Sequence, residues 1–544
     1  MMFKSARTDA TTGLSTRASI RPSKGRTTES SRLLLSLGIF LFVGLVSLPG
    51  SAAANVTGPY EFFTASSLAR QTVIAGFFLE GEIAEIGVIH TDVNGKPSLQ
   101  MYQFDGEGWQ LVLEAALRSE VLFVDKARIN GKDRLFTYEP DRLNWFDPET
   151  KSERLLVEVS THFVSTAANE IPHLQVFRDI NDDGRDDIVV PDVDGFWIAT
   201  QSDDGAFAEP FRLGPPEPFL NGAATIGEPG TYGQLGISVN TNPNYQSRVH
   251  LADFNQDGRR DLAFWNTDHF DVYFQDSQGQ FHETPETTAS SVPFFSDGLY
   301  SLLLGFDNES NLSLLTGLRK KTSRTVLDKI RDTNGDGIPD LVTVTMTGRS
   351  MLKQRLNLDV HFGKADNTGV VFEQDVGTAI KAQGKATAAT YSSITLHDDT
   401  HSGDVTAMVM EVETGIAGIA RALLKRSVAL NLSFYRTQSG TFPAEPNMKL
   451  RIKRPFFPVF LIGDIIGDEH PDLLVSAGPQ HVNIHEGVPT ADVFDTDART
   501  ILMDITRNEA DTHLVNLTSD AKLSVLAYHP SDTGPHRIQV LLSQ

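Results

Sequence analysis

The sequence feature that most constrains the fold is a nine-residue segment, Asp332 to Asp340. It reads Asp-Thr-Asn-Gly-Asp-Gly-Ile-Pro-Asp, so oxygen-bearing side chains stand at positions 1, 3, 5 and 9, and Gly stands at position 6. The Gly allows a sharp reversal of the backbone. A hard cation such as calcium takes about six to eight oxygen ligands, and three carboxylates, an Asn carbonyl and a backbone carbonyl supply most of them. The segment therefore predicts a calcium loop.

The residues after this loop indicate a β-strand rather than a helix. An EF-hand needs an acid at position 12 and a helix on each side. Position 12 here is Thr343, inside the run Leu341-Val342-Thr343-Val344, which has the composition of a strand. The loop is therefore predicted to lead into a sheet.

The same pattern of acids, Gly and trailing apolar residues recurs along the chain. Two complete copies begin at Asp179 and Asp253. A copy that begins at Asp464 keeps its acids at positions 1, 5 and 9 but has Ile466 at position 3 and Glu469 at position 6, so we expect weak metal binding there or none. Fainter copies in the same frame begin at Phe77, Lys126, Asp398 and Asn516.

These eight frames predict a repeat fold. They are separated by roughly 50 to 80 residues, and strand-like runs such as Leu99 to Phe104 and Leu358 to Phe362 follow several of them. Repeats of this length with short strands favour an all-β β-propeller built from four-stranded blades. Eight frames predict eight blades, with seven as the alternative if the Phe77 frame is false. We expect Tyr60 to Thr64 to close the ring against the strands after Ser524, because a propeller must cover its first and last edges.

A family resemblance is carried by the motif D-x-N-x-D-G-x-x-D-L, followed by a V-x-F-type strand and a G-x-F turn such as Gly279-Gln280-Phe281. The motif resembles the FG-GAP or VCBS repeat, which is the unit of the propeller at the N-terminus of integrin α chains. The resemblance covers nearly all of the chain after its leader and is specific at three loops. It implies an integrin-α-like propeller with about three structural Ca²⁺ sites.

The resemblance also implies a ligand set at each of the three loops. The side-chain ligands it implies are Asp179, Asn181, Asp183 and Asp187 in the first, Asp253, Asn255, Asp257 and Asp261 in the second, and Asp332, Asn334, Asp336 and Asp340 in the third. The implied backbone carbonyl ligands at position 7 are those of Arg185, Arg259 and Ile338. The departures at Lys126, Asp398, Asp464 and Asn516 put metal binding at those frames in doubt.

The N-terminal residues predict export. A long Ser-, Thr-, Arg- and Lys-rich start precedes the apolar run Leu33 to Leu48, and Ser51-Ala52-Ala53-Ala54 follows. This order is that of a cleaved secretory signal, which predicts a signal peptide over 1–54 and a single propeller domain over 55–544; an uncleaved anchor is the alternative. After cleavage we expect no membrane span. The absence of cysteine in an exported chain is more typical of a bacterial protein, secreted or periplasmic.

The net charge of −23 argues against nucleic-acid partners and grows more negative once the basic leader is removed. Two long insertions, 209–248 and 283–328, are predicted to contact a ligand or to be decoration without one. A third, Gly415 to Val428, has apolar residues at helical spacing and predicts a short helix on the propeller rim.

Three functional hypotheses follow from this organisation. We favour a non-catalytic interaction module for a protein or polysaccharide ligand. The alternative is a lyase-like polysaccharide-active enzyme, for which Arg319 to Arg324 is the dense basic segment considered as a source of a base. A purely structural scaffold of the cell envelope is the third hypothesis.

The histidines offer a weaker enzymatic signal. His397 and His401 are four residues apart, a spacing that can share a transition metal on a helix. They fall within a loop frame, so we interpret them as part of a degenerate calcium loop. His470, His481 and His485 alternate with apolar residues, which predicts single imidazoles on a solvated strand face.

Overall fold

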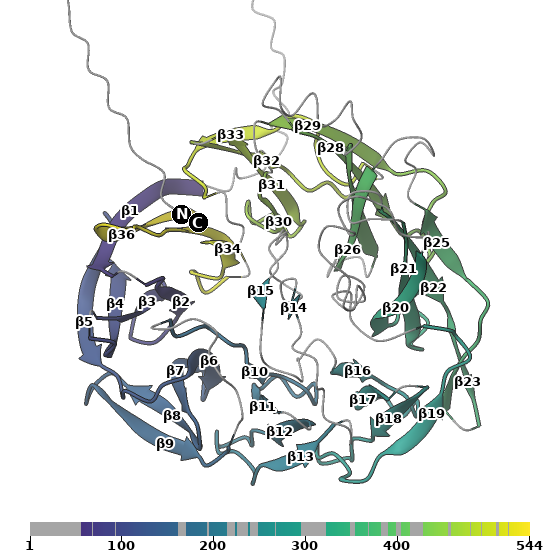
Figure 1. Cartoon of the computed structure of the whole chain (residues 1–544), viewed down its shortest axis with the longest axis horizontal. Coiled ribbons are helices and arrows are strands. Elements are labelled where there is room, and N and C mark those ends of the chain that lie inside the picture. The colour runs from purple at the N-terminus through teal and green to yellow at the C-terminus, as the bar shows by residue number, and fades with distance from the viewer. Residues whose placement is uncertain are drawn as a thin grey trace, which may run out of the picture. The chain divides into compact units, whose positions relative to one another are not determined.

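Eight antiparallel sheets of four strands each form the described part of the chain and are arranged as the blades of a β-propeller (Figure 1). The structure is a computed structural model, and the propeller belongs to the unit Ala53–Gln544. It describes residues 56–543 except for 68, 93, 161–169, 193–194, 215–223, 226–237, 240–248, 267, 295–321, 349–353, 368, 382–389, 399–403, 414–427, 455–457, 479, 491, 507–510 and 521. The prediction of eight blades, rather than seven, is confirmed.

Each blade is numbered here by its order along the chain, and its strands are given from the inside of the ring outward. Blade 1 holds β2 (Thr72–Gly76), β3 (Glu85–Thr91), β4 (Pro97–Phe104) and β5 (Trp109–Ala116), and blade 2 holds β6 (Phe123–Ile129), β7 (Lys132–Glu139), β8 (Arg142–Asp147) and β9 (Ser152–Val157). Blade 3 holds β10 (Phe177–Arg178), β11 (Asp187–Asp192), β12 (Gly195–Ala199) and β13 (Phe211–Leu213), and blade 4 holds β16 (His250–Ala252), β17 (Asp261–Asn266), β18 (His269–Tyr273) and β19 (Glu286–Ala289).

The second half of the ring follows the same order. Blade 5 holds β20 (Thr322–Arg331), β21 (Asp340–Gly348), β22 (Gln354–His361) and β25 (Thr378–Lys381), and blade 6 holds β26 (Thr390–Asp398), β27 (Val405–Glu413), β28 (Val428–Arg436) and β29 (Met448–Arg454). Blade 7 holds β30 (Phe460–Gly463), β31 (Asp472–Gly478), β32 (His481–His485) and β33 (Arg499–Leu502). Two-stranded hairpins are formed by β14 (Ala224–Thr225) with β15 (Ser238–Val239), and by β23 (Gly363–Asp366) with β24 (Gly369–Phe372).

Blade 8 closes the ring with strands from both ends of the chain. Its inner strands are β34 (Thr512–Val515), β35 (Ser524–His529) and β36 (Pro535–Ser543), and its outer strand is β1 (Val56–Ser66). β1 pairs antiparallel with β36, with Phe62 opposite Ile538. This pairing covers the edge of β36 that would otherwise be open, and it confirms the predicted closure. Figure 1 shows the purple β1 beside the yellow β36.

The hydrophobic core is divided among the boundaries between blades. The described residues form eight buried clusters, each drawing its side chains from two adjacent blades. In β17, Leu262 and Phe264 pack toward blade 3, whereas Ala263 and Trp265 pack toward blade 5. Both faces of this strand are therefore buried, which explains why apolar runs rather than strict alternation follow the loops.

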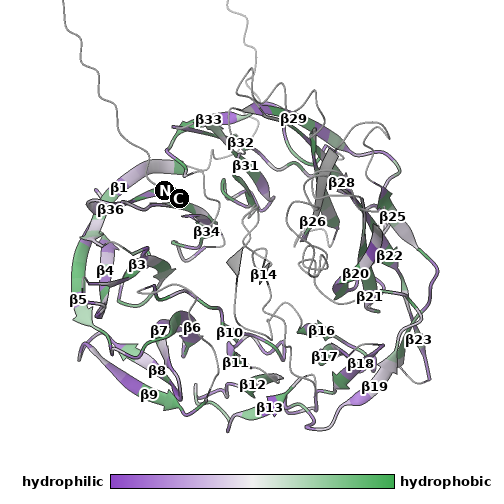
Figure 2. Ribbon diagram, viewed as in Figure 1, coloured by the Kyte–Doolittle hydropathy of each residue, from purple (hydrophilic) through white to green (hydrophobic). Residues whose placement is uncertain are grey.

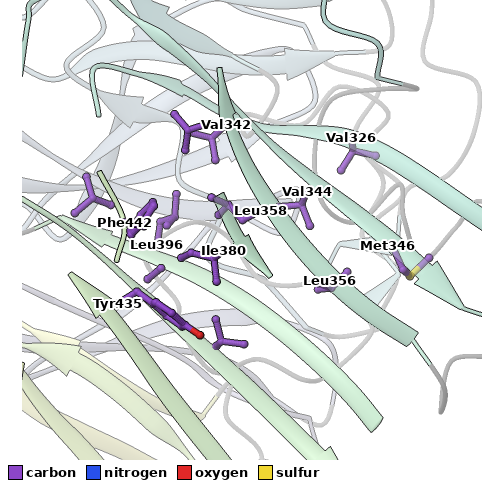
Figure 3. Packing of buried hydrophobic residues seen from close by; sticks show 14 residues of the cluster. Val326, Val342, Val344, Met346, Leu356, Leu358, Ile380, Leu396, Tyr435 and Phe442 are labelled. Atoms are coloured by element: carbon purple, nitrogen blue, oxygen red, sulfur yellow. The ribbon is translucent and has the colours of Figure 1, made fainter. Parts of the chain in front are cut away.

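Figure 3 shows one such cluster between blades 5 and 6, where Val342, Val344 and Leu358 meet Leu396 and Tyr435. Leu358 is fully buried there. Figure 2 shows that hydrophilic residues alternate with hydrophobic ones on many of the outer strands, which face solvent on part of their surface. The core thus ties each blade to its neighbours, and the ring depends on all eight blades.

The predicted insertions fall largely outside the described residues. The helix expected over Gly415 to Val428 lies almost entirely within 414–427, which is outside the described range. The boundaries of the other insertions need correction, because 209–248 includes outer strand β13 and 283–328 includes outer strand β19 and the start of inner strand β20. These outer strands are only three and four residues long, Phe-Arg-Leu in β13 and Glu-Thr-Thr-Ala in β19, so neither gave a clear strand pattern in the sequence. No helix occurs among the described residues.

Candidate functional site

Six of the eight frames span the connection between the first and second strands of a blade. The exceptions are the Lys126 frame, most of which lies within β6 and β7, and the Asp398 frame, whose loop in 399–403 is outside the described residues. The three complete loops are Asp179–Asp187, Asp253–Asp261 and Asp332–Asp340, in the consecutive blades 3, 4 and 5. In each, the last acid of the loop is also the first residue of the second strand. The loop and the strand that follows it are therefore one structural unit.

The complete loops share a backbone conformation. Positions 4 and 6 both have positive φ, with values of 62° and 82° at Asp182 and Gly184, 61° and 86° at Gln256 and Gly258, and 77° and 82° at Gly335 and Gly337. Gly adopts this conformation without strain, whereas Asp and Gln at position 4 pay a cost of roughly 1–2 kcal/mol. Something in the loop must offset that cost.

The acids of the loop supply the compensating hydrogen bonds. In the Asp179 loop, the N–H groups of Asp183 and Gly184 donate to the Asp179 carboxylate at 3.1 and 2.8 Å. The Asn181 Oδ1 accepts from Asp183 N–H at 3.2 Å, and Asp183 Oδ1 accepts from Arg185 N–H at 2.9 Å. The side chains at positions 1, 3 and 5 thus hold the turn through backbone amides.

Equivalent bonds form in the other two complete loops. Asp253 accepts from the N–H groups of Asp257 and Gly258 at 3.0 and 2.8 Å. Asp332 accepts from Gly335 and Gly337 at 2.7 and 2.8 Å. The position-5 acids accept from position 7, Asp257 from Arg259 at 3.0 Å and Asp336 from Ile338 at 2.8 Å.

The acid at position 9 is buried and joins the loop to the rest of its blade. Asp187 is fully buried and accepts from Ile180 N–H at 3.1 Å and from Gln201 N–H at 2.8 Å, at the end of β12. Burial raises the pKa of Asp187 to about 7; the two N–H donors lower it, and the charges of Asp183 and Asp179 raise it. Three acids of one loop therefore repel one another.

The buried acids of the other complete loops behave in the same way. Asp261 accepts from Phe254 N–H at 2.9 Å and Gln275 N–H at 3.0 Å, and burial raises its pKa to about 6. Asp340 accepts from Thr333 N–H at 2.8 Å and Gly363 N–H at 2.9 Å, and burial raises its pKa as well. In all three complete loops, the buried acid at position 9 therefore accepts two backbone N–H groups, an arrangement that we call the clamp.

The oxygen atoms of these loops are the groups that would bind a metal ion. Within the described residues, no three His, Cys, Asp or Glu side chains are grouped closely enough to hold a metal ion. The carboxylates are turned toward backbone N–H groups instead. An ionised carboxylate has about four lone-pair sites, so an oxygen that accepts one N–H retains capacity for a cation. Carboxylate, amide and carbonyl oxygens are the ligands that calcium prefers, so the oxygen types present in each complete loop fit calcium.

Arginine side chains at position 7 add contacts that the sequence pattern did not reveal. Arg185 pairs with Asp183 at 2.5 Å and Asp203 at 2.7 Å, and its Nε donates to the Gln201 carbonyl at 3.0 Å. Arg259 likewise pairs with Asp257 and donates to the Gln275 carbonyl. At these two positions only the backbone carbonyls were predicted to have a role, as metal ligands.

Hydrogen bonds and an ion pair connect the complete loops of neighbouring blades. Gln275 Nε2 donates to the carbonyl of Asn181 in the preceding blade at 2.7 Å, and Arg260 lies 3.3 Å from Asp182. Gln256 Nε2 donates to the Gly337 carbonyl of the following blade at 3.5 Å. The three complete loops therefore form one continuous surface at one side of blades 3 to 5.

The loop at Asp464 shows which of these features require a complete motif. Gly467 and Glu469, at positions 4 and 6, have φ values of 83° and 72°, so the backbone shape is kept although the glycine has moved. Asp472 is fully buried and accepts from Ile465 and Ile466 N–H at 2.8 Å each and from Gly487 N–H at 2.9 Å. Position 3 is Ile466, which is itself buried. The clamp therefore persists where the metal-ligand set is incomplete.

The Phe77 frame, which is the weakest in the sequence, has a buried acid at position 9 like the complete loops. Glu85, nine positions into the Phe77 frame, is buried and accepts from Phe78 and Leu79 N–H at 2.9 Å each. At the Asn516 frame, Ser524 Oγ accepts from Ser543 N–H at 3.1 Å and Asp520 pairs with Lys522 at 3.1 Å. The frame at Asp398 has its loop in 399–403, outside the described residues.

The frame at Lys126 was wrong as a loop. Lys126 lies within β6, and β6 joins β7 through the two-residue turn Asn130-Gly131, both with positive φ. Asn-Gly is the preferred sequence for such a hairpin turn. The Lys126 ammonium donates to the Ala75 carbonyl of blade 1, so this side chain connects two adjacent blades.

His397 lies in the core rather than in a metal site. It is buried on β26, and its predicted partner His401 is outside the described residues. Burial lowers the pKa of His397 to about 3, with a smaller contribution from Lys329. The predicted solvated face for the other histidines is wrong at His485, which is buried with Nδ1 2.9 Å from the Asp495 carbonyl.

We expect His397 to make the protein sensitive to acid. Between about pH 6.5 and 3 the unfolded chain binds a proton at His397 that the folded chain does not, so stability falls as the pH falls. From pH 7 to pH 5 the loss amounts to about 2 kcal/mol. Chemical denaturation at both pH values in chelator measures it, and His397→Gln should lose that much less. An unchanged pH dependence in the variant would contradict this assignment.

Comparisons with known proteins give the context of the fold. No protein-family model matches the chain, and no curated protein matches it in sequence. Three similar solved structures are a propeller of Dos1 (9% identity, 89% of this chain, 95% of that chain, TM-score 0.36), the WD40 domain of SCAP from fission yeast (10%, 88%, 98%, 0.31) and a candidate 6-phosphogluconolactonase from Bacteroides uniformis (12%, 75%, 92%, 0.29). Because each TM-score is below 0.5, the propeller assignment rests on the sheet order of the chain itself.

The comparisons do not establish the FG-GAP or VCBS family for this chain. Among the described residues, no helix is long and apolar enough to cross a membrane. The apolar run Leu33 to Leu48 lies outside the described residues.

Proposed function

We propose that this chain is an exported, calcium-stabilised eight-bladed propeller that acts as a non-catalytic interaction module for a protein or glycan. The observation that carries the proposal is the set of three complete loops in consecutive blades, braced against each other by contacts such as Gln275 to Asn181. A rigid ring of this kind positions its connecting segments for recognition. The role in binding is inferred from the fold class, and propellers host many functions.

Calcium has a defined place in this proposal. The residues that would hold it are the acids at positions 1, 5 and 9, the Asn at position 3 and the carbonyl at position 7, in the three loops that begin at Asp179, Asp253 and Asp332. When bound, the ion neutralises carboxylates that otherwise repel one another and connects the two ends of the loop. The chain's own residues already set the turn through backbone hydrogen bonds, so binding requires the carboxylates to turn toward the ion rather than the backbone to refold.

The binding role can be separated from catalysis with a panel of polysaccharides. We expect the mature protein to be retained on at least one immobilised acidic or neutral polysaccharide in the presence of calcium, without generating new unsaturated or reducing ends. Release of such products would contradict the proposal and favour the lyase-like alternative. Retention without products supports the module, whereas neither retention nor products would contradict it and favour the purely structural scaffold.

A further inference from the structure

The turn between the third and fourth strands of blade 4 contacts the preceding blade. This turn covers 276–280 and is closed by a hydrogen bond from Gly279 N–H to the Asp276 carbonyl at 3.2 Å. The Gly279 carbonyl accepts a hydrogen bond from Asn181 Nδ2 at 3.3 Å. Asn181 stands at position 3 of the complete loop in blade 3. A residue that would bind calcium in one blade is therefore in contact with a glycine of the next blade.

The same contact is closer at the complete loop of blade 5. In blade 6 the turn between β28 and β29 contains Ser439 and Gly440, with φ values of 50° and 74°. Gly440 lies directly against Asn334, which is position 3 of the loop in blade 5. A Cβ atom at Gly440 would lie 2.3 Å from the Asn334 Cβ and 2.4 Å from its Cα. Any side chain at Gly440 must therefore displace Asn334.

The complete loop of blade 4 makes its contact one residue earlier. The N–H of Val370, in the β23–β24 hairpin of blade 5, donates to the Phe254 carbonyl at 3.0 Å. A Cβ atom at Gly369 would lie 2.7 Å from the same oxygen. Phe254 comes directly before Asn255, the position-3 residue of this loop. Each complete loop thus contacts a glycine-containing turn of the following blade, and blades 3 to 6 follow one another along the ring (Figure 1).

The two sides of the position-3 Asn face different blades. Its Oδ1 lies within its own loop and accepts the N–H of position 5, which is Asp183 at 3.2 Å from Asn181 and Asp336 at 2.9 Å from Asn334. An amide oxygen has two lone pairs, so Oδ1 can still bind calcium. The opposite side of Asn181 is bound by blade 4, because Gln275 Nε2 donates to the Asn181 carbonyl at 2.7 Å. The next blade therefore fixes where the Oδ1 ligand lies.

We propose that two blades jointly set the calcium affinity of the complete loops in blades 3 and 5, with Gly279 and Gly440 as positioning residues for Asn181 and Asn334. The inference rests on the proposed function, because it requires that these loops bind calcium. Calcium–oxygen distances lie within about 2.3–2.6 Å. A small displacement of the Asn therefore weakens its contribution. The coupling is reciprocal, so calcium in one loop also stabilises the contact with the next blade.

Packing between blades without any effect on calcium is the alternative explanation, and blade 3 contains a matched control for it. The turn 202–206 has the same form as 276–280, with Gly205 N–H donating to the Ser202 carbonyl at 2.8 Å. Gly205 and Gly279 both have a φ of 80°. The two turns therefore differ chiefly in what they contact.

Gly205 contacts an Asn that is not part of a complete loop. A Cβ atom at Gly205 would lie 2.6 Å from Nδ2 and 2.8 Å from Oδ1 of Asn130, in the hairpin turn of blade 2. A Cβ atom at Gly279 would lie farther from its neighbour, 3.1 Å from Asn181 Nδ2. If steric strain alone weakened calcium binding, Gly205→Ala would have a larger effect than Gly279→Ala. The proposal predicts the reverse order.

The test measures calcium binding to the mature protein by isothermal titration calorimetry. Gly440→Ala, Gly279→Ala and Gly205→Ala each place a side chain at a positive φ, so all three should lower the stability in chelator. We expect one of the three sites to bind about tenfold more weakly in Gly440→Ala and about threefold more weakly in Gly279→Ala. Gly205→Ala should change no site by more than about twofold.

A second set of variants identifies the affected site. In a chain that already carries Asp332→Ala, adding Gly440→Ala should leave the two remaining sites unchanged, because the loop that Gly440 contacts no longer binds calcium. Gly279→Ala added to Asp179→Ala gives the same test through the milder substitution, should Gly440→Ala fail to fold.

Wild-type affinity at all three sites in Gly440→Ala and Gly279→Ala would overturn the inference and leave calcium binding standing. An equal loss in Gly205→Ala would also overturn it, as would weaker binding at the two remaining sites when Gly440→Ala is added to Asp332→Ala. A wild type that binds no calcium would overturn the calcium-stabilised propeller itself, and the inference with it.

Discussion

Replacing Asp472 by Ala is expected to lower the free energy of unfolding by about 4 kcal/mol, because the change leaves buried backbone donors without an acceptor. The donors are the N–H groups of Ile465, Ile466 and Gly487, which lie 2.8 to 2.9 Å from the carboxylate. Each unpaired group costs about 1–3 kcal/mol. Since this loop lacks the full ligand set, we expect the same loss with calcium and with chelator. Equilibrium denaturation in guanidinium chloride measures both.

The neighbouring acid Asp468 provides the matched control. It is exposed and accepts a single hydrogen bond from His470 N–H at 3.0 Å. Asp468→Ala should therefore cost about 1 kcal/mol or less. Comparable losses in Asp468→Ala and Asp472→Ala would contradict the clamp, as would a loss in Asp472→Ala that appears only when calcium is present.

The second large effect is expected from calcium at the three complete loops. With a dissociation constant of about 0.1 mM and about 1 mM free calcium, mass action stabilises the folded chain by about 1.4 kcal/mol per site. Three independent sites give about 4 kcal/mol, which is a large part of the stability of an ordinary domain. The triple variant Asp179→Ala, Asp253→Ala and Asp332→Ala should lose this dependence on calcium.

The triple variant is also expected to be less stable than the wild type in chelator. The position-1 acids accept backbone N–H groups whether or not a metal is bound, for example Gly184 N–H at 2.8 Å from Asp179. Two quantities must therefore be separated: the stability in chelator, which reports the hydrogen bonds, and the gain on adding calcium, which reports the metal. A triple variant that still gains stability from calcium would place the metal elsewhere.

The repeat could be predicted from sequence because in five of the eight blades the last residue of the frame is a buried acid, namely Glu85, Asp187, Asp261, Asp340 and Asp472. A buried acid that accepts backbone N–H groups cannot be exchanged freely, so the frame survives at Asp472 and even at Glu85, where few other positions are kept. That acid also precedes the second strand, which gives the frame its trailing apolar run. Counting frames therefore predicted the number of blades correctly.

The sequence pattern could not separate hydrogen bonding from metal binding, because the same acids serve both. Positions 1, 5 and 9 are present at Asp464 without the full ligand set, and there they accept the same kind of backbone hydrogen bonds as in the complete loops. Asn at position 3 and Gly at position 6 distinguish the three complete loops from this one. Metal binding remains a proposal that the fold itself does not require.

Other features depend on neighbours that are distant in sequence. The Lys126 frame was identified as a faint copy of the loop, but in the folded chain its residues Asn130-Gly131 form a two-residue hairpin turn. The Lys126 side chain donates a hydrogen bond to the Ala75 carbonyl of the adjacent blade. The braces from Gln275 to Asn181 and from Gln201 to the Arg128 carbonyl also cross blade boundaries. Contacts between residues of different blades cannot be predicted from the residue spacing within one frame.

The most direct test of the central claim is the melting temperature of the mature wild-type protein, measured by calorimetry in about 1 mM calcium and again in excess chelator. If calcium occupies the three complete loops, chelation should lower the melting temperature by about 4 °C, provided that the ring unfolds as one unit. Superimposable melting curves in the two solutions would contradict the claim that calcium stabilises this propeller.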